Sequence, residues 1–244
     1  MKYLLVCLFV GFAGRECLAQ ATLPDTAFIT DAVKNTIRVY ENYLEGQQLF
    51  YSGSLYSEPA RTNQTHAFFL NNEWMPESIT FDGQLFRNVP VMYDITSDEL
   101  ITESVTGNPQ ILPRDRISNF SLMGRYFEKI RNSDYESSLP RSGFFEVLYD
   151  GKTKVICLRQ KFVQEKMEHN KIERDFYEKS KYFVLINGKF FQIKSKRSLL
   201  QLLEDRKTEL RAFVKKNKNA FKNYPEVSLA TISKEYDLLT AGKK

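Results

Sequence analysis

The sequence has little cysteine for a chain that begins like an exported protein. Of its three cysteines, Cys7 and Cys17 lie within the first 20 residues, so removal of that segment leaves only Cys157. A single cysteine cannot form an intramolecular disulfide, which excludes the disulfide-stapled class of small secreted domains. Cys157 lies in the apolar run 155–158, a setting typical of a thiol packed in a core.

Histidine is nearly as scarce. His66 has no second histidine or cysteine at a metal-ligand spacing. His169 has Glu165 and Glu173 four residues to either side, but Asn170 and the flanking strand pattern indicate a turn, not a helix that would align them. The chain also lacks a Gly-x-Ser-x-Gly elbow, a Walker sequence and a dinucleotide fingerprint. We therefore predict no metal, no cofactor and no assigned catalytic residue.

Neighbouring acidic residues offer a candidate for a two-carboxylate acid–base site. Asp94 could act with Asp98 and Glu99, but the intervening residues 95–97 predict a turn, where carboxylates are normally solvated. Trp74 is the only tryptophan, so no indole-rich sugar platform accompanies them. A hydrolase with dispersed catalytic residues, among them His66 or Asp94, is the second alternative function.

The first 19 residues predict a signal peptide. Lys2 precedes the apolar run 3–13, which is too short for a stable membrane helix, and Ala19 offers a small side chain for cleavage. We therefore expect an exported protein that is periplasmic, associated with the outer envelope or secreted. No transmembrane segment is expected after cleavage.

The remaining chain is divided in charge. Residues 150–244 carry 23 Lys and Arg against 12 Asp and Glu, a net charge of +11, whereas residues 20–149 carry 10 against 17, a net of −7. Such asymmetry indicates either an anionic partner for the basic half or attraction between the two halves. The 19 Phe and 13 Tyr favour sheets over helical bundles.

Hydrophobic periodicity predicts an α+β fold. An amphipathic helix is expected over 26–44, because apolar residues recur there every three or four positions. Asp82-Gly83, Asp150-Gly151 and Asn187-Gly188 each stand between aromatic or β-branched runs and predict two-residue hairpins, and Gly124 indicates a fourth. Serial hairpins give a curved antiparallel β-meander, a half-barrel or roll. Residues 103–113 and 134–142 are expected to be loops.

After Lys194 the period changes to that of helices. Ser198 is the expected N-cap, with Gln201 completing a capping box. Pro225 marks a last helix over 226–239, whose inward residues are expected to be Val227, Ala230 and Leu238. The predicted organisation is a signal peptide at 1–19, a helix plus meander at 20–194, and a basic helical region at 195–244 packed on the same domain.

A cationic helical face is the candidate binding surface. Its members are spaced by three and four residues, opposite an apolar stripe: Lys207, Arg211, Lys215, Lys218 and Lys222. An anionic envelope component, an acidic protein or peripheral contact with a membrane suits this face. Export and the lack of interleaved aromatics on this face disfavour nucleic acid, so we predict no nucleic-acid partner.

The sequence thus favours an exported, non-enzymatic binding or structural module of the cell envelope. The first alternative is a carrier of a small apolar ligand in a curved sheet. Its wall would be aromatic, made by Phe68, Phe69, Phe81, Phe86, Tyr93, Phe120, Phe145 and Tyr149.

Four segments spread over the mature chain carry a family resemblance. They are 49–56, 81–95, 143–149 and 195–200, which include Phe81-Asp82-Gly83 and Gly143-Phe144-Phe145-Glu146. On these segments the chain resembles a family of exported proteins from Bacteroidota-type bacteria. The resemblance implies an envelope or secreted protein and no catalytic residues.

Overall fold

The computed structural model describes residues 30–31, 33–34, 36, 53–58, 65–104, 106–137, 139–168, 171–217 and 225–241. The chain forms two compact units, Met1–Gln47 and Gln48–Lys244. The predicted signal peptide lies outside the described residues. Most of the predicted helix over 26–44 also lies outside the described residues. Only five residues of that range are described, and all five are helical.

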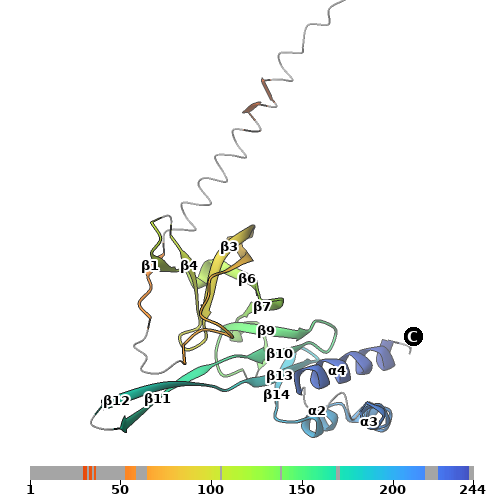
Figure 1. Ribbon diagram of the computed structural model, residues 1–244. Coiled ribbons are helices and arrows are strands. Elements are labelled where there is room, and N and C mark those ends of the chain that lie inside the picture. The colour runs from red at the N-terminus through yellow and green to blue at the C-terminus, as the bar shows by residue number, and fades with distance from the viewer. Residues whose placement is uncertain are drawn as a thin grey trace, which may run out of the picture. The chain divides into compact units, whose positions relative to one another are not determined.

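The second unit is an α+β structure built on an open sheet of 12 strands, ordered β1-β5-β4-β3-β2-β6-β7-β9-β10-β13-β14-β8 (Figure 1). The first seven strands are β1 Ser54–Leu55, β2 Met75–Phe81, β3 Gln84–Asp94, β4 Glu99–Glu103, β5 Pro109–Ile111, β6 Ile117–Leu122 and β7 Arg125–Ile130. The others are β8 Glu136–Ser137, β9 Gly143–Tyr149, β10 Val155–Leu158, β13 Lys181–Ile186 and β14 Lys189–Ile193. Different strands stand at the two ends of this order, so the sheet is not closed.

Most neighbours in the sheet follow chain order, as a meander requires. Within the body of the sheet the order reverses at β2, which pairs with β3 on one side and with β6 on the other. The chain reaches β6 through the 3-10 turn Arg114–Arg116. The short β8 is the exception to antiparallel pairing, since it runs parallel to β14.

Three of the four predicted two-residue hairpin turns are confirmed. Asp82-Gly83 joins β2 to β3, Met123-Gly124 joins β6 to β7, and Asn187-Gly188 joins β13 to β14. Both residues of each turn have positive φ, between 48° and 78°. This conformation matches the twist of the flanking strands and is accessible to Gly, Asn and Asp at low cost.

The prediction of a two-residue turn at Asp150-Gly151 is wrong. Five residues, 150–154, separate β9 from β10. Asp237 organises this longer loop, because its Oδ2 accepts hydrogen bonds from the Tyr149 hydroxyl and the Thr153 N–H, both at 3.0 Å. The two predicted loops were also too long, since β4, β5 and β8 take residues from them.

Strands β2 to β7, which we call the aromatic half, surround a core of rings. Phe120 stacks on Phe127 with centroids 4.9 Å apart, and Tyr93 and Phe144 meet Phe120 edge-on at 5.2 and 5.1 Å. Such ring pairs add about 0.5–1.5 kcal/mol each beyond area burial. Aliphatic side chains complete this cluster, among them Ile79, Val91 and Leu122.

Strands β9, β10, β13 and β14 with three helices form the helix-covered half. The helices are α2 Lys196–Leu202, α3 Lys207–Lys216 and α4 Pro225–Ala241, with a 3-10 turn at Glu204–Arg206. Leu199, Leu203 and Leu210 from α2, the turn after it and α3 are buried against Val184 and Ile193 of the strands. The N-cap of α2 is Ser195, not Ser198: the Ser195 side chain accepts from the Ser198 N–H, and the Ser198 side chain completes the capping box.

Helix α4 presents a different face to the core from the one predicted. Leu229 and Ile232 are buried, whereas Val227 and Leu238 are 52% and 61% exposed. Two small polar residues, Ser228 and Ser233, share the buried face. A prediction from hydrophobicity alone therefore assigned the wrong face of α4 to the core.

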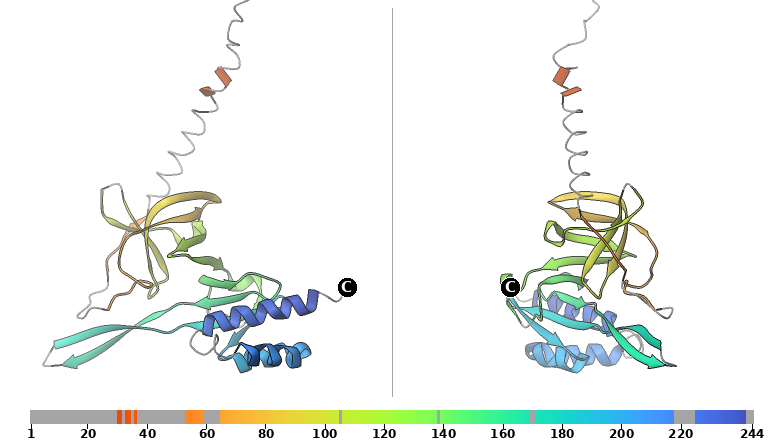
Figure 2. Two further views of the ribbon diagram at one scale, coloured as in Figure 1. Left: turned by 45° about the vertical axis from the view of Figure 1, so that its right-hand side comes forward. Right: turned by 90° about the vertical axis from the view of Figure 1, so that its left-hand side faces the viewer.

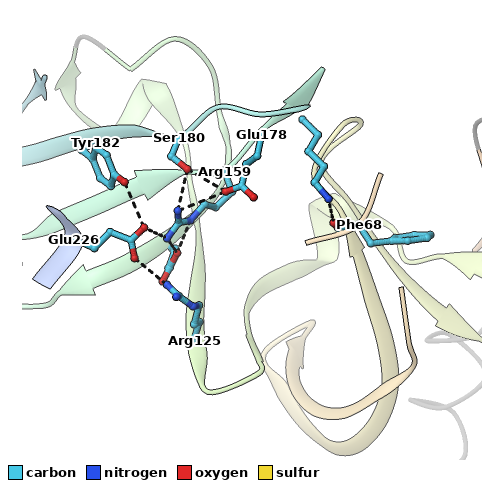
Figure 3. Close-up of polar contacts among 9 residues, drawn as sticks. Phe68, Arg125, Arg159, Glu178, Ser180, Tyr182 and Glu226 are labelled. Carbon is cyan, nitrogen blue, oxygen red and sulfur yellow. Dashed lines mark hydrogen bonds and ion pairs between the residues drawn. The ribbon is translucent and has the colours of Figure 1, made fainter. Parts of the chain in front are cut away.

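Strands β11 Lys161–Glu168 and β12 Lys171–Glu178 form a separate two-stranded sheet, the ribbon. It extends from the ends of β10 and β13, well beyond the main sheet (Figures 1 and 2). Eight residues of β-strand span about 25 Å. The described base of the ribbon is fixed by Lys161, whose Nζ donates to the carbonyls of His66 and Phe68 at 2.9 and 2.5 Å. Figure 3 draws the contact at Phe68.

Candidate functional site

Four charged side chains from distant parts of the chain meet where the aromatic half and the helix-covered half adjoin, and we call them the ion cluster: Arg125, Glu146, Arg159 and Glu226. Arg125 begins β7, Glu146 lies in the middle of β9, Arg159 follows β10, and Glu226 lies in the first turn of α4. The arrangement is drawn in Figure 3.

Arg159 is at the centre of the ion cluster and is buried with Glu146. Its Nη2 lies 2.6 Å from Glu146 Oε2 and 2.6 Å from Glu226 Oε1. Its Nε donates to Glu146 Oε2 at 2.7 Å, and its Nη1 donates to Ser180 Oγ at 2.9 Å. Arg159, which lies between β10 and the ribbon strand β11, thus connects the base of the ribbon to strand β9 and to helix α4.

Arg125 completes the ion cluster from the other side. Its Nη1 donates to Glu146 Oε1 at 2.5 Å and to Glu226 Oε2 at 3.1 Å. The Phe69 ring lies beneath both guanidinium groups, with its centroid 5.9 Å from Arg125 and 5.7 Å from Arg159. A ring of the aromatic half therefore contacts both arginines of the ion cluster.

The ion cluster favours the charged form of Glu226. Burial opposes the charge on Glu226, but Arg159 and Arg125 together hold the pKa of this carboxyl below its ordinary value. Burial, with the charge of Glu226 and other nearby groups, raises the pKa of Tyr182 to about 12. Tyr182 is therefore a neutral donor to Glu226 Oε1, at 3.4 Å.

A cleft of about 450 Å³ opens beside the ion cluster, between α4 and strands β7 and β9. Arg125, Glu146 and Glu226 form its polar part. Its other lining residues are Gly124, Tyr126, Val147, Leu148, Val227, Ala230 and Thr231. The volume falls within the range of small-molecule sites, about 300–1,000 Å³.

The predicted cationic face is described in part. Arg211 and Lys215 are exposed on α3, Lys207 at its start is half-buried, and Leu210 faces the core. Lys218 and Lys222 lie outside the described residues, beyond the end of α3.

The predicted pair of carboxylates has two structural roles. Asp94 Oδ1 accepts the N–H groups of Thr96 and Ser97, and its Oδ2 accepts the Tyr56 hydroxyl at 2.9 Å. Asp98 instead accepts from Tyr93 and Arg141, both at 2.6 Å. Each aspartate is buried and has its own partners, so the two do not form a shared acid–base site.

Cys157, His66 and His169 are the other residues considered for chemistry from the sequence. Cys157 is buried in β10, and burial raises the pKa of its thiol to about 12. His66 is half-buried and stacks on Phe68, whereas His169 lies outside the described residues. Among the described residues, no group of three His, Cys, Asp or Glu side chains could hold a metal ion.

The eight aromatic residues proposed to line a ligand cavity do not share one wall. Phe69, Phe81, Tyr93 and Phe120 belong to the core of the aromatic half, and Phe86 packs against it. Phe68, Phe145 and Tyr149 belong to three other hydrophobic clusters.

Sequence reasoning did not single out the ion cluster. Glu146 and Arg159 stand in or beside otherwise apolar strands, and a charged residue in such a run was the available signal. Nothing local indicated that Glu226 would reach Arg125, which is 101 residues away.

Within the described residues, no helix is both long and apolar enough to cross a membrane. Searches with the chain against protein-family models, curated proteins and solved structures return no significant match. The resemblance to exported proteins of Bacteroidota-type bacteria therefore stays a prediction.

Proposed function

We propose that this protein is an exported, non-enzymatic binding module of the cell envelope, which holds an extended segment of a partner polypeptide along the outer edge of β11. The observation that carries the proposal is the ribbon, a pair of long strands with exposed apolar side chains and an edge on which no described strand pairs. In this proposal the main sheet curls as a half-barrel or roll, the helix over 26–44 precedes it, and the signal peptide at 1–19 is removed.

Several large apolar side chains of the ribbon are exposed. Met167 is 79% exposed, and its cross-strand partner Ile172 is 52% exposed. Phe162, Val163 and Tyr177 are exposed as well. A hairpin of two strands is only marginally stable alone in water, so a partner that covers these side chains would stabilise it.

The hydrogen-bonding pattern of the ribbon identifies the groups that face outward. Glu168 pairs with Lys171 across a two-residue connection, and such a closing pair exchanges ladder hydrogen bonds. By alternation, the N–H and C=O groups of Val163, Glu165 and Met167 point away from β12. Two contacts at the base fit this pattern: the Lys161 N–H donates to the Ile95 carbonyl, and the Phe176 N–H donates to Thr65 Oγ1.

No strand covers the β11 edge within the described part of the chain. Outward N–H and C=O groups that alternate along an edge match the backbone of another polypeptide, which is why exposed edges bind extended segments. This match favours a polypeptide partner over a lipid or a sugar.

The side chains suited to chemistry support a non-enzymatic role. Asp94 and Asp98 hold turns and tyrosines, and the Cys157 thiol is buried and protonated. The cationic face of α3 is a second contact surface in this proposal. Exposed Arg211 and Lys215 suit an anionic envelope component.

The edge is tested by proline substitution. Glu165→Pro removes one outward N–H without removing a bond between β11 and β12, whereas Glu165→Ala removes only the side chain. A photo-crosslinking amino acid at position 167, in cells that make the protein, should give a discrete adduct that survives Glu165→Ala and falls at least tenfold with Glu165→Pro. The same amino acid at Met123, an exposed hairpin turn, should not give this adduct.

Equal adduct yields from the two Glu165 variants would reject pairing along β11. An adduct that contains only copies of this chain would show that the bound segment comes from a second copy of the chain and not from another protein. Arg211→Glu combined with Lys215→Glu should leave the adduct unchanged and reduce sedimentation with anionic lipid vesicles; unchanged sedimentation would remove the cationic face from the proposal.

A further inference from the structure

The cleft beside the ion cluster has hydrogen-bond donors without a described partner, although the carboxylate oxygens of Glu146 and Glu226 are all engaged. Glu146 Oε1 accepts from Arg125, and Oε2 accepts from Arg159. Glu226 Oε1 contacts Arg159 and Tyr182, and Oε2 accepts from Arg125. All four carboxylate oxygens of the ion cluster therefore have partners.

Arg125 is the group with unused capacity. A guanidinium has five N–H donors, and the two contacts of Arg125 with carboxylates both use Nη1. Its Nε–H and the two N–H bonds of Nη2 have no partner among the residues that the structure describes. The side chain is 35% exposed and lines the cleft.

The geometry of the unused N–H groups of Arg125 indicates which ligand they can bind. Nε and Nη2 of a guanidinium form a planar fork whose two N–H bonds match the two oxygens of a carboxylate. The first turn of α4, which lines the same cleft at Glu226 and Val227, adds the positive end of a helix dipole. An acceptor with negative charge is therefore favoured over a cation at this point.

The remaining walls of the cleft are largely apolar. Tyr126, Leu148, Val227 and Ala230 surround the polar end. Val227 faces outward from α4 instead of joining the core, so it supplies apolar surface to the cleft. A ligand that satisfied the Arg125 fork would place its remaining atoms against these side chains.

We propose that this cleft binds a small molecule with a carboxylate head and an apolar tail, in which the carboxylate is held by Nε and Nη2 of Arg125 and the tail lies against Tyr126, Leu148, Val227 and Ala230. This site is separate from the β11 edge, and the inference does not rest on the proposed function.

Octanoate is a suitable probe, titrated into the full mature chain by isothermal titration calorimetry. Saturable binding of one octanoate per chain is expected. Val227→Glu places a negative charge in the cleft without touching the ion cluster and should weaken octanoate binding at least tenfold. Leu238→Glu is the matched control: it puts the same charge at an exposed position on the same helix, outside the cleft, and should leave the affinity unchanged.

Two further measurements keep the proposal falsifiable. Octylammonium has the same tail and the opposite charge, and binding of octylammonium in preference to octanoate would overturn the assigned polarity. Arg125→Lys keeps the positive charge and loses the fork, so it should weaken octanoate binding at least tenfold while the thermal unfolding midpoint shows that the chain is folded. Absence of saturable octanoate binding, or equal weakening by Val227→Glu and Leu238→Glu, would reject the site.

Discussion

The aromatic half and the helix-covered half of the sheet bury their polar groups in different ways. In the aromatic half, Asp98 accepts from Tyr93 and Arg141 at the margin of a core made of stacked rings. In the helix-covered half, Glu146, Arg159 and Glu226 instead form a continuous ion cluster, which Arg125 of the adjoining strand β7 completes. From this comparison we expect ring packing to dominate the stability of the first region, and ion pairing with distant residues to contribute to that of the second.

The largest effect is expected from removal of a central ring in the aromatic half. Phe120→Ala deletes a fully buried side chain that contacts three other rings, so we expect a loss of about 4 kcal/mol in the free energy of unfolding. Urea unfolding measures this loss. Leu85→Ala, at an exposed position of the same half, is the control and should change stability far less. If the two variants are equally stable, ring packing does not dominate this half.

The next largest effect is expected in the ion cluster. Arg159→Met leaves Glu146 buried with Arg125 alone, and such a loss costs about 3 kcal/mol. The exposed pair of Arg174 with Glu165 in the ribbon is the control, because Arg174→Met should cost less than about 1 kcal/mol. Adding Glu146→Gln to Arg159→Met should restore part of the loss. A cost for Arg159→Met no greater than for Arg174→Met would show that the two halves do not differ in this respect.

The smallest effect concerns acid stability. The folded pKa of Glu226 lies below its ordinary value, so its charged form stabilises the fold fully above the unfolded pKa of about 4.3, and this contribution is lost as the pH falls through the lower folded pKa. Glu226→Gln should therefore flatten the fall in stability below about pH 4.3. Because Glu226 is partly exposed, screening keeps this change below that of Arg159→Met.

Urea unfolding from pH 5 to pH 2.5 measures the change, with Glu165→Gln in the ribbon as the matched control. An acid profile that is the same in Glu226→Gln and in the unaltered protein would show that the ion cluster does not confer acid sensitivity on the helix-covered half.

The comparison also shows which features of the fold could be predicted from the sequence and which could not. The turns at Asp82-Gly83 and Asn187-Gly188 follow from the conformational freedom of adjacent residues, so the strands that they join were predicted. The loop at 150–154 was not, because its length depends on Asp237, more than 80 residues away. The reversal of strand order at β2 and β6 is likewise a product of tertiary packing.

The candidate site could be predicted even less. Glu146 and Arg159 stand out in the sequence as charges in or beside apolar runs, but only the fold brings Arg125 to Glu226. The face of α4 was mispredicted for a related reason: Ser228 and Ser233 turn inward while Val227 turns toward the cleft. Periodicity ranks faces by hydrophobicity alone, so it cannot detect a helix whose first turn is positioned by an ion pair.

Arg159 lies where the chain leaves β10 for the ribbon, and its guanidinium contacts Glu146 of β9 and Glu226 of α4. A pull on the ribbon is therefore opposed by side-chain bonds to two other elements as well as by the backbone of β10. The ribbon is therefore anchored at its base by side chains as well as by the backbone. We expect a force applied to its tip to reach the first turn of α4 through the contact of Arg159 with Glu226.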